Sequence, residues 1–233
     1  MFGVRLNLDK YAEQIEWLEE RPVQTGKILF YGDSFFAHSS FTYRRRKPEN
    51  PKPILEEEVR MKDGSGAILN HGFGGAASDE LLYYYDRLVR PYAPRALVVH
   101  IGSNDLGYAY SVAETMDRIG LLVDWFQYDF PDAPVYLMNR TPGLTNIGLV
   151  NDKTRRRDEY NQAIEWLVSA RRGVKLIRMN EFPFLFNDPA DIGDYDKIRT
   201  DLHDPDGKHL NAEGYGMMMD WYRTFLEKEG LLS

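Results

Sequence analysis

Lys27-Ile-Leu-Phe-Tyr-Gly-Asp-Ser34 decides the fold, because an apolar run there leads directly into a polar tripeptide. The run predicts a β-strand over residues 27–31, with Ser34 at its end. Further along the chain, two more predicted strands lead into Asn70-His-Gly-Phe-Gly-Gly75 and Gly102-Ser-Asn-Asp105. In an open α/β sheet, ligands bind outside the carboxyl ends of the strands. The sequence therefore predicts that these three motifs meet at one edge of a sheet.

Strands alternate with helices along the chain, which predicts a parallel sheet with right-handed crossovers. The expected strands cover residues 27–31, 66–70, 95–101, 134–139 and 174–179, and the expected helices cover 8–20, 54–61, 78–89, 111–128, 153–170 and 212–229. Ser78 and Asn211 are predicted to cap helices, and Gly173 is predicted to end one. Residues 40–53 and 180–205 are expected to be loops.

Composition limits the classes of protein to consider. The 233 residues suffice for one α/β domain with a sizeable core, so we expect a single domain over residues 1–233, with residues 1–25 as an N-terminal helical extension. The net charge of −7 gives a nucleic-acid partner no electrostatic support. The chain has no cysteine, which excludes thiolate chemistry and fits the cytoplasmic location that we expect. Residues 1–20 are rich in acid, unlike a signal peptide, and no apolar run approaches the ~18 residues of a membrane helix, so we expect no membrane insertion.

Asp206-Gly-Lys-His209, near the C-terminus, offers a carboxylate and an imidazole three residues apart. A serine hydroxyl is a weak nucleophile unless a nearby base takes its proton. His209 can be that base for Ser34, and Asp206 can hold the imidazole in one tautomer. The backbone N–H groups of Ser34 and Gly75 and the side-chain amide of Asn104 can stabilise the negative oxygen of a tetrahedral intermediate. Together these residues are a candidate site for acyl transfer.

With the four motifs in this order, the chain resembles the SGNH (GDSL-type) hydrolases from about Lys27 to Tyr215. The four named residues of that family, and the Asp that precedes its His by three positions, fall on Ser34, Gly75, Asn104, His209 and Asp206. The resemblance implies a three-layer α/β/α sandwich with a five-stranded parallel sheet and flavodoxin-like topology. It also implies hydrolysis of esters or thioesters without a metal or an organic cofactor. Phe35 stands where the GDSL name has Leu, and residues 36–63 match no motif of the family.

We therefore expect a serine esterase that acts on a small-molecule ester with a short acyl chain, and O-acetyl groups on carbohydrates are candidate substrates. A thioesterase, a lysophospholipase or an acyltransferase would use the same residues. A catalytically silent member of the fold that binds acylated or sugar ligands is an alternative of a different class.

Each candidate residue also has a purely structural interpretation. Ser34, Asn104 and Asp105 are residue types that cap helices, and the glycines of residues 72–75 also suit tight packing. Asp204 competes with Asp206 for contact with His209. The histidines outside the motif of His209 are expected to be structural or surface residues, with His71 and His100 the best candidates to line a pocket; they are His38, His71, His100 and His203.

The chain also contains one basic run and one run of tyrosines. Arg44-Arg-Arg-Lys47 is typical of a solvated face, and contact with an anionic substrate is its alternative role. Tyr83-Tyr-Tyr85 is expected to divide between the core and a helix surface. The five histidines lack the close spacing of a zinc site, and residues 201–206 lack the EF-hand spacing, so we expect no metal.

Overall fold

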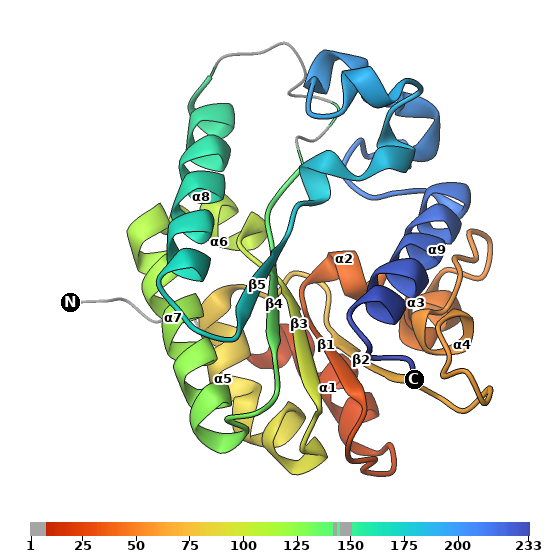
Figure 1. Cartoon of the computed structure of the whole chain (residues 1–233), viewed down its shortest axis with the longest axis vertical. Coiled ribbons are helices and arrows are strands. Elements are labelled where there is room, and N and C mark those ends of the chain that lie inside the picture. Colours follow the sequence, from red (N-terminus) through yellow and green to blue (C-terminus); the bar gives the residue numbers. More distant parts are fainter. Residues whose placement is uncertain (1–7, 142–143, 145–150) are drawn as a thin grey trace.

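The computed structural model describes residues 8–141, 144 and 151–233 of the chain. In this part of the chain, five parallel strands form one sheet in the order β2-β1-β3-β4-β5 (Figure 1). The strands are β1 (Ile28–Gly32), β2 (Ile68–Gly72), β3 (Ala96–His100), β4 (Val135–Met138) and β5 (Val174–Ile177). This order is that of flavodoxin-like doubly wound sheets. The predicted fold class is therefore confirmed.

Helices cover both faces of the sheet and complete a three-layer α/β/α sandwich (Figure 1). One face carries α1 (Leu8–Glu19), α5 (Ser78–Leu88), α7 (Val112–Asp129) and α8 (Asp152–Ser169). The other face carries α2 (Ser34–Ala37), α4 (Leu55–Glu58) and α9 (Ala212–Lys228), with α3 (Phe41–Arg46) nearby. Within the described residues, no helix combines the length and the hydrophobicity that a membrane span needs.

The apolar run of β1 supplies both halves of the core. Successive side chains of a strand point to opposite faces of the sheet. Leu29 and Tyr31 accordingly pack beneath α1 and α5, whereas Ile28 and Phe30 pack beneath α9. The Phe30 ring lies edge-on against Tyr222 of α9, with 5.0 Å between ring centroids. Burying such a side chain contributes ~1.5–3 kcal/mol, so a polar residue in this run would weaken one of the two cores.

The register of β1 brings three strand ends to one edge. Gly32, the last residue of β1, pairs with Gly72 on β2 and with His100 on β3. Because the strands are parallel, the segments that follow them leave the sheet side by side. The motifs predicted to follow these strands therefore meet at the carboxyl edge of the sheet, as expected.

All predicted strands and helices are present, with ends close to those expected, but some local predictions are wrong. Residues 40–53 are not entirely loop, because Ser40 caps the short helix α3 by accepting a hydrogen bond from the N–H of Tyr43 at 3.3 Å. Ser78 is the first residue of α5 and not its cap. Its side chain binds Asp105 instead. Gly173 has φ +76° but lies beyond Ala170, the C-cap of α8.

Residues 180–205 form a chain of short 3₁₀ turns that packs over one end of the sheet (Figure 1). Buried apolar side chains such as Leu185, Ile198 and Leu202 attach these turns to the core beneath α9. These turns are η3 (Met179–Glu181), η4 (Pro183–Leu185), η5 (Pro189–Asp191), η6 (Tyr195–Lys197) and η7 (Thr200–Leu202). One further 3₁₀ turn, η1 (Arg90–Tyr92), lies elsewhere in the chain, just before β3. Asn211 then caps α9 by accepting a hydrogen bond from the N–H of Gly214 at 3.0 Å, as predicted.

Candidate active site

Ser34 is the first residue of α2, immediately after β1. Asp33, not Ser34, is the N-cap of this helix, because its carboxylate accepts a hydrogen bond from the N–H of Phe35 at 3.0 Å. The same carboxylate oxygen lies 2.8 Å from Nδ1 of His100. Burial acts to raise the pKa of Asp33, but His100 and the N–H of Phe35 lower it below its usual range. The Ser34 side chain is therefore free of capping duty and stands on a well-anchored turn.

Ser34, His209 and Asp206 form a continuous hydrogen-bonded chain. Oγ of Ser34 lies 2.8 Å from Nε2 of His209, and Nδ1 of His209 lies 2.7 Å from Oδ2 of Asp206. A carboxylate only accepts hydrogen bonds, so Nδ1 carries the proton that points at Asp206. In neutral His209, Nε2 is then the acceptor that faces the serine hydroxyl. This geometry suits proton transfer from Ser34 to His209.

The loop of Asp206 holds its carboxylate in place. Oδ1 accepts hydrogen bonds from the backbone N–H groups of Lys208 and His209, at 2.8 and 3.0 Å. Partial burial acts to raise the pKa of Asp206, but the hydrogen bonds from the His209 side chain and from the two N–H groups lower it to about 2. Asp206 is therefore ionised at neutral pH and faces the imidazole with a full negative charge.

Asp204, the competing aspartate, has other partners. Its carboxylate pairs with Nζ of Lys52, whose side chain is fully buried, and lies 3.3 Å from Nδ2 of Asn50. Its backbone N–H donates to the carbonyl oxygen of His209 at 2.8 Å. Asp204 thus fastens the loop of His209 to residues 50–52, while Asp206 contacts the imidazole.

Asn104 lies within the short helix α6 (Ser103–Gly107) and does not cap it. One N–H of its amide donates to the carbonyl oxygen of Ala76 at 2.8 Å. An amide nitrogen has two N–H groups, so the second remains for a ligand. Asp105 turns away from the site and accepts hydrogen bonds from the N–H and the hydroxyl of Ser78. Burial raises the pKa of Asp105 to about 6.

Gly75 precedes the residue that Asn104 contacts, and its φ of +88° suits glycine. Its carbonyl oxygen accepts a hydrogen bond from the hydroxyl of Tyr11 at 2.7 Å. Within the described residues, the N–H groups of Gly75 and Ser34 donate to no acceptor. These two N–H groups and the amide of Asn104 are therefore available to a developing oxyanion.

A second glycine explains how α6 reaches the site. Gly102 has φ +109°, and a Cβ on it would lie 2.4 Å from the ring of Tyr160. The Tyr160 hydroxyl donates to the carbonyl oxygen of Ile101 at 2.6 Å. Only glycine fits this close approach, which lets the chain turn directly from β3 into α6 and present Asn104.

A cavity of about 240 Å³ opens at this edge of the sheet. Ser34, Asn104 and His209 line it, and Gly75 is not among its lining residues. Arg140, Thr141 and Met179 line it from outside the four sequence motifs, and Lys208 lines it from within the motif of His209, although no role was predicted for it from the sequence. A larger cavity of about 660 Å³ lies between α7 and α8 and contains none of the predicted site residues. Because a catalytic serine must be reached by substrate, the smaller cavity is the candidate active site.

His38 is a site residue that sequence reasoning missed. Its ring stacks on that of His209, with centroids 3.8 Å apart, and on that of Tyr43 at 4.2 Å. Burial, and then the charges of His209 and Lys52, lower the pKa of His38 to about 3, so it is neutral at physiological pH. It acts as a flat, uncharged surface behind His209. The sequence did hold one indication of this position. His38 follows Ser34 by four residues, and residues four apart lie on the same side of a helix, so α2 places both near the site.

Of the two histidines expected to line a pocket, one lines the cavity and the other does not. His100 lines the cavity beside Asp33. His71 does not: its ring is fully buried, and its Nδ1 lies 2.7 Å from the carbonyl oxygen of Leu88. Burial lowers its pKa to about 4. His203 is half-buried and lies 3.0 Å from the carbonyl oxygen of Arg199, which is a structural contact.

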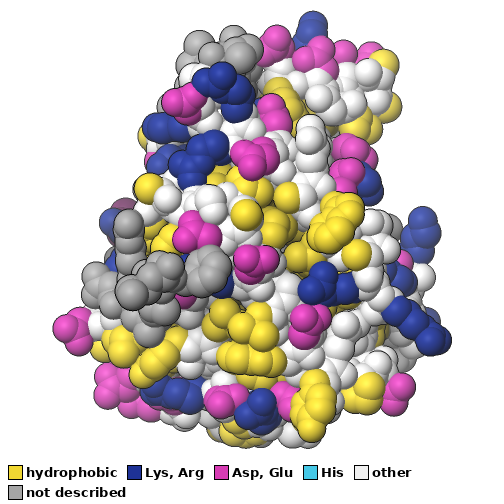
Figure 2. Space-filling model, turned by 90° about the vertical axis from the view of Figure 1, so that its left-hand side faces the viewer, with side chains coloured by type: hydrophobic (Ala, Val, Ile, Leu, Met, Phe, Trp, Pro, Cys, Tyr) yellow, Lys and Arg dark blue, Asp and Glu magenta, His cyan; other side chains and the backbone are white. Residues whose placement is uncertain are grey.

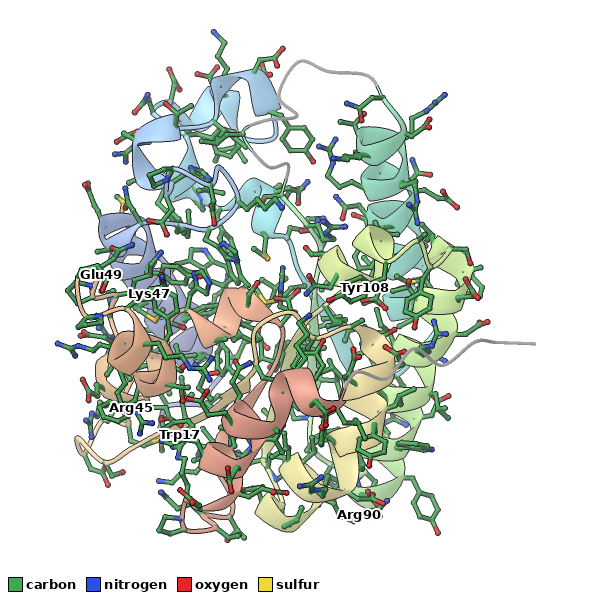
Figure 3. All side chains as sticks on the ribbon, turned by 180° about the vertical axis from the view of Figure 1, so that it is seen from behind. Trp17, Arg45, Lys47, Glu49, Arg90 and Tyr108 are labelled. Carbon is green, nitrogen blue, oxygen red and sulfur yellow. The ribbon has the colours of Figure 1, made fainter. Side chains whose placement is uncertain are left out.

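The basic run of residues 44–47 does not line the cavity. Arg44 pairs with Glu57 at 3.9 Å, and Arg46 pairs with Glu13. Figure 3 shows Arg45 and Lys47 at the outer edge of the molecule, on the side away from α6. The run therefore forms a solvated face, as predicted, and does not take the alternative role of contacting an anionic substrate in this cavity. The tyrosines of residues 83–85 divide as expected, since Tyr84 and Tyr85 are buried and Tyr83 is exposed.

The α/β/α sandwich, with a serine and a histidine in contact at the carboxyl edge of its sheet, is the arrangement expected of an acylhydrolase with a doubly wound fold. Residues 30–217, most of the chain, match the GDSL-like lipase/acylhydrolase family, and the chain belongs to that family. This membership confirms the resemblance to the SGNH hydrolases and makes the protein an ester-hydrolysing enzyme in the broad sense. Among curated proteins, none matches the sequence significantly.

Solved structures agree on the fold. A lipase/acylhydrolase from Enterococcus faecalis is 16% identical, covers 88% of this chain and 97% of its own, and has a TM-score of 0.65. A psychrotrophic esterase from Pseudoalteromonas, in a form inhibited by monoethylphosphonate, is 16% identical, covers 87% and 97%, and has a TM-score of 0.61. An acetyl-xylooligosaccharide esterase from Geobacillus is 17% identical, covers 89% and 95%, and also has a TM-score of 0.61.

Proposed function

We propose that this protein is a serine esterase that hydrolyses short-chain carboxylic esters through Ser34, His209 and Asp206. The observation that carries the proposal is the hydrogen-bonded chain from Oγ of Ser34 through the imidazole to Asp206, with distances of 2.8 and 2.7 Å. An ionised Asp206 fixes the tautomer of His209, so Nε2 is an acceptor when substrate arrives.

The reaction proceeds in two halves. Oγ of Ser34 attacks the ester carbonyl while its proton moves to Nε2 of His209. The carbonyl oxygen becomes negative and accepts hydrogen bonds from the N–H groups of Ser34 and Gly75 and from the amide of Asn104. The tetrahedral intermediate breaks its bond to the alcohol oxygen, which takes the proton from His209. Water then attacks the acyl-enzyme by the same route, and the acid and free Ser34 result.

The cavity supports a short acyl group. Its volume of about 240 Å³ lies below the ~300–1,000 Å³ of pockets that enclose drug-sized ligands. An acetyl group fits such a space, and the relative from Geobacillus acts on an acetylated xylooligosaccharide. We therefore extend the proposal to O-acetyl groups on carbohydrates.

Covalent labelling tests the proposal against a catalytically silent protein. A fluorescent alkyl phosphonate should label wild type and not Ser34→Ala, because only an activated serine reacts. Ser39→Ala is the matched control, since Ser39 is a buried serine near α2 that does not line the cavity. The same proteins are assayed with p-nitrophenyl acetate. Labelling of Ser34→Ala equal to that of wild type would contradict the proposal, and so would equal turnover.

A further inference from the structure

A second cavity, of about 380 Å³, adjoins the candidate active site. The two cavities share a border, because Ser103, Arg140, Thr141 and Lys208 line both of them. The outer walls of the second cavity come from α6 and from the first two turns of α8. A substrate whose ester group reaches Ser34 can therefore extend past Lys208 into this space.

The second cavity is strongly basic in an acidic protein. The chain carries a net charge of −7, yet no acidic residue is among the described residues that line this cavity. The basic lining residues are Arg140, Lys153, Arg156, Arg157 and Lys208. Several like charges around a confined space attract an anion more strongly than any one of them does.

Two of the five cations have a structural role. The guanidinium of Arg156 donates to the carbonyl oxygens of Leu106 and Tyr110, which ties α8 to the end of α6. Arg157 pairs with Asp158 at 2.6 Å. For Lys153 and Lys208, by contrast, the described part of the chain contains no ion-pair partner. Figure 2 shows several Lys and Arg side chains near the upper end of this side of the molecule, where α8 begins.

Arg140 is the most informative of the five because it is charged, largely enclosed and without a carboxylate partner among the described residues. Its guanidinium donates one long hydrogen bond, 3.4 Å from Nη1 to the carbonyl oxygen of Gly102, and its Cζ lies 5.7 Å from the ring centroid of Tyr160. Its buried Nε has no hydrogen-bond partner in the described part of the chain. Burial lowers the pKa of its guanidinium below the usual range. A buried charge destabilises a protein unless something pairs with it. The Arg140 guanidinium lies where the two cavities meet, so an anion bound there would pair with it and offset the cost of its burial.

We propose that the second cavity binds an anionic group, a phosphate or a carboxylate, on the alcohol part of the ester that Ser34 attacks. The assignment to the alcohol part rests on the proposed function. His209 returns its proton to the leaving alcohol, and Lys208 next to it lines both cavities. The planar guanidinium of Arg140 and the two lysines suit either anion. The favoured substrate class is a short-chain ester of a phosphorylated or acidic sugar.

Binding can be measured without catalysis, with inorganic phosphate as the probe. At constant ionic strength, phosphate should raise the melting temperature of wild type, because it binds only the folded state. The increase should be lost in Arg140→Met and in the double variant Lys153→Gln/Lys208→Gln. Arg155→Gln is the matched control, since Arg155 lies on the same helix, pairs with Asp152 and lines neither cavity. Equal phosphate effects in all four proteins would show an adventitious ion only and would overturn the proposal.

A comparison of kcat/KM for neutral and charged esters tests this inference separately from the proposed function. The substrates are mono-O-acetyl esters of glucose, glucose 6-phosphate and glucuronate. Wild type should have kcat/KM for at least one charged ester about tenfold or more above that for the neutral ester, the effect of one or two charge-assisted hydrogen bonds. The double variant should lose this preference, mainly through KM, while Arg155→Gln keeps it.

The outcomes are distinct. If wild type hydrolyses p-nitrophenyl acetate but shows no preference for either charged ester, the inference fails and the proposed function stands. If wild type neither hydrolyses esters nor reacts with the phosphonate, the proposed function fails, and loss of phosphate binding in Arg140→Met still decides whether the cavity is an anion site. The charged ester that wild type favours identifies phosphate or carboxylate as the group bound.

Discussion

Asp204 and Asp206 show how two residues of one type, two positions apart, acquire different tasks from their neighbours. Asp206 lies against Nδ1 of His209, and Asp204 pairs with the buried ammonium of Lys52. In the proposed mechanism, the first contact orients the imidazole that accepts the proton of Ser34. The second compensates a charge that has no water around it. The chemistry of each carboxylate thus follows from its partner.

Exchanging each aspartate for asparagine should separate these tasks. Asp206→Asn should lower kcat by up to about 10⁴-fold, because an amide favours the wrong tautomer of His209. Asp204→Asn should change kcat little but lower the free energy of unfolding by about 3 kcal/mol, because it removes the carboxylate that pairs with the buried side chain of Lys52. Ester kinetics and urea unfolding of both variants make the comparison. Our assignment is wrong if Asp204→Asn is the variant that loses turnover.

Asn104 should act on the transition state and hardly on the ground state. Replacing it with Ala should lower kcat by about 10²–10³-fold, the cost of one oxyanion-hole donor. KM should change less, because the oxyanion forms only after binding. Asn211→Ala is the control: it removes a helix cap and should cost about 1 kcal/mol of stability without loss of kcat. An effect of Asn104→Ala on KM alone would point to substrate binding instead.

At the scale of elements, the segment of residues 36–63 supports the loop that carries His209. Tyr43 of α3 stacks on His38, which stacks on His209. Nζ of Lys52 contacts both Asp204 and the carbonyl oxygen of Leu210. A segment that matches no family motif therefore braces the imidazole from behind, which is a structural role that its polar composition did not suggest.

The contact between α5 and α6 should make stability depend on pH. Burial raises the pKa of Asp105 to about 6 in the folded state, above the ~3.9 of an exposed Asp. The folded state therefore binds a proton more readily, and stability from this group increases as pH falls through 6. Asp105→Asn lacks this increase, so the difference in melting temperature, wild type minus variant, should grow between pH 8 and pH 5. A difference that shrinks over this range would contradict the raised pKa.

At the scale of the whole molecule, polar and hydrophobic surfaces lie in different places. The two cavities at the carboxyl edge of the sheet are polar and adjoin Ser34. The α7–α8 face carries patches of hydrophobic side chains (Figure 2). Trp166 of α8 and Tyr128 of α7 are both exposed. Hydrophobic surface is thus available on the molecule, but away from the serine. This division argues against a long acyl chain as the preferred substrate.

The dependence of kcat/KM on acyl length tests whether the enzyme prefers short acyl chains. The kcat/KM for p-nitrophenyl acetate or butyrate should be well above that for the decanoate, because a small cavity leaves most of a long chain in water. Each methylene left unburied forgoes ~0.8 kcal/mol of binding. Activity is measured over a series from two to twelve carbons below the micelle concentration. A steady rise in kcat/KM to twelve carbons would indicate a lipid substrate.

The sequence by itself determined the architecture and most of the candidate site. Apolar runs such as residues 28–31 and helical periodicity are local patterns, so they predicted the strands, the helices and their order. Because parallel strands end at one edge, the motifs after them had to meet, and Ser34 and Asn104 do line one cavity. The three-residue spacing of Asp206 and His209 is also local.

Only the tertiary structure decided which side chains complete the site. It separated Asp204 from Asp206 and stacked His38 on His209. It also gathered Arg140, Lys153 and Lys208 around one cavity from the end of β4, the start of α8 and the loop before α9. No local pattern links these residues, because their proximity follows from how helices pack across the sheet. In the sequence they are three separate basic residues in an acidic chain.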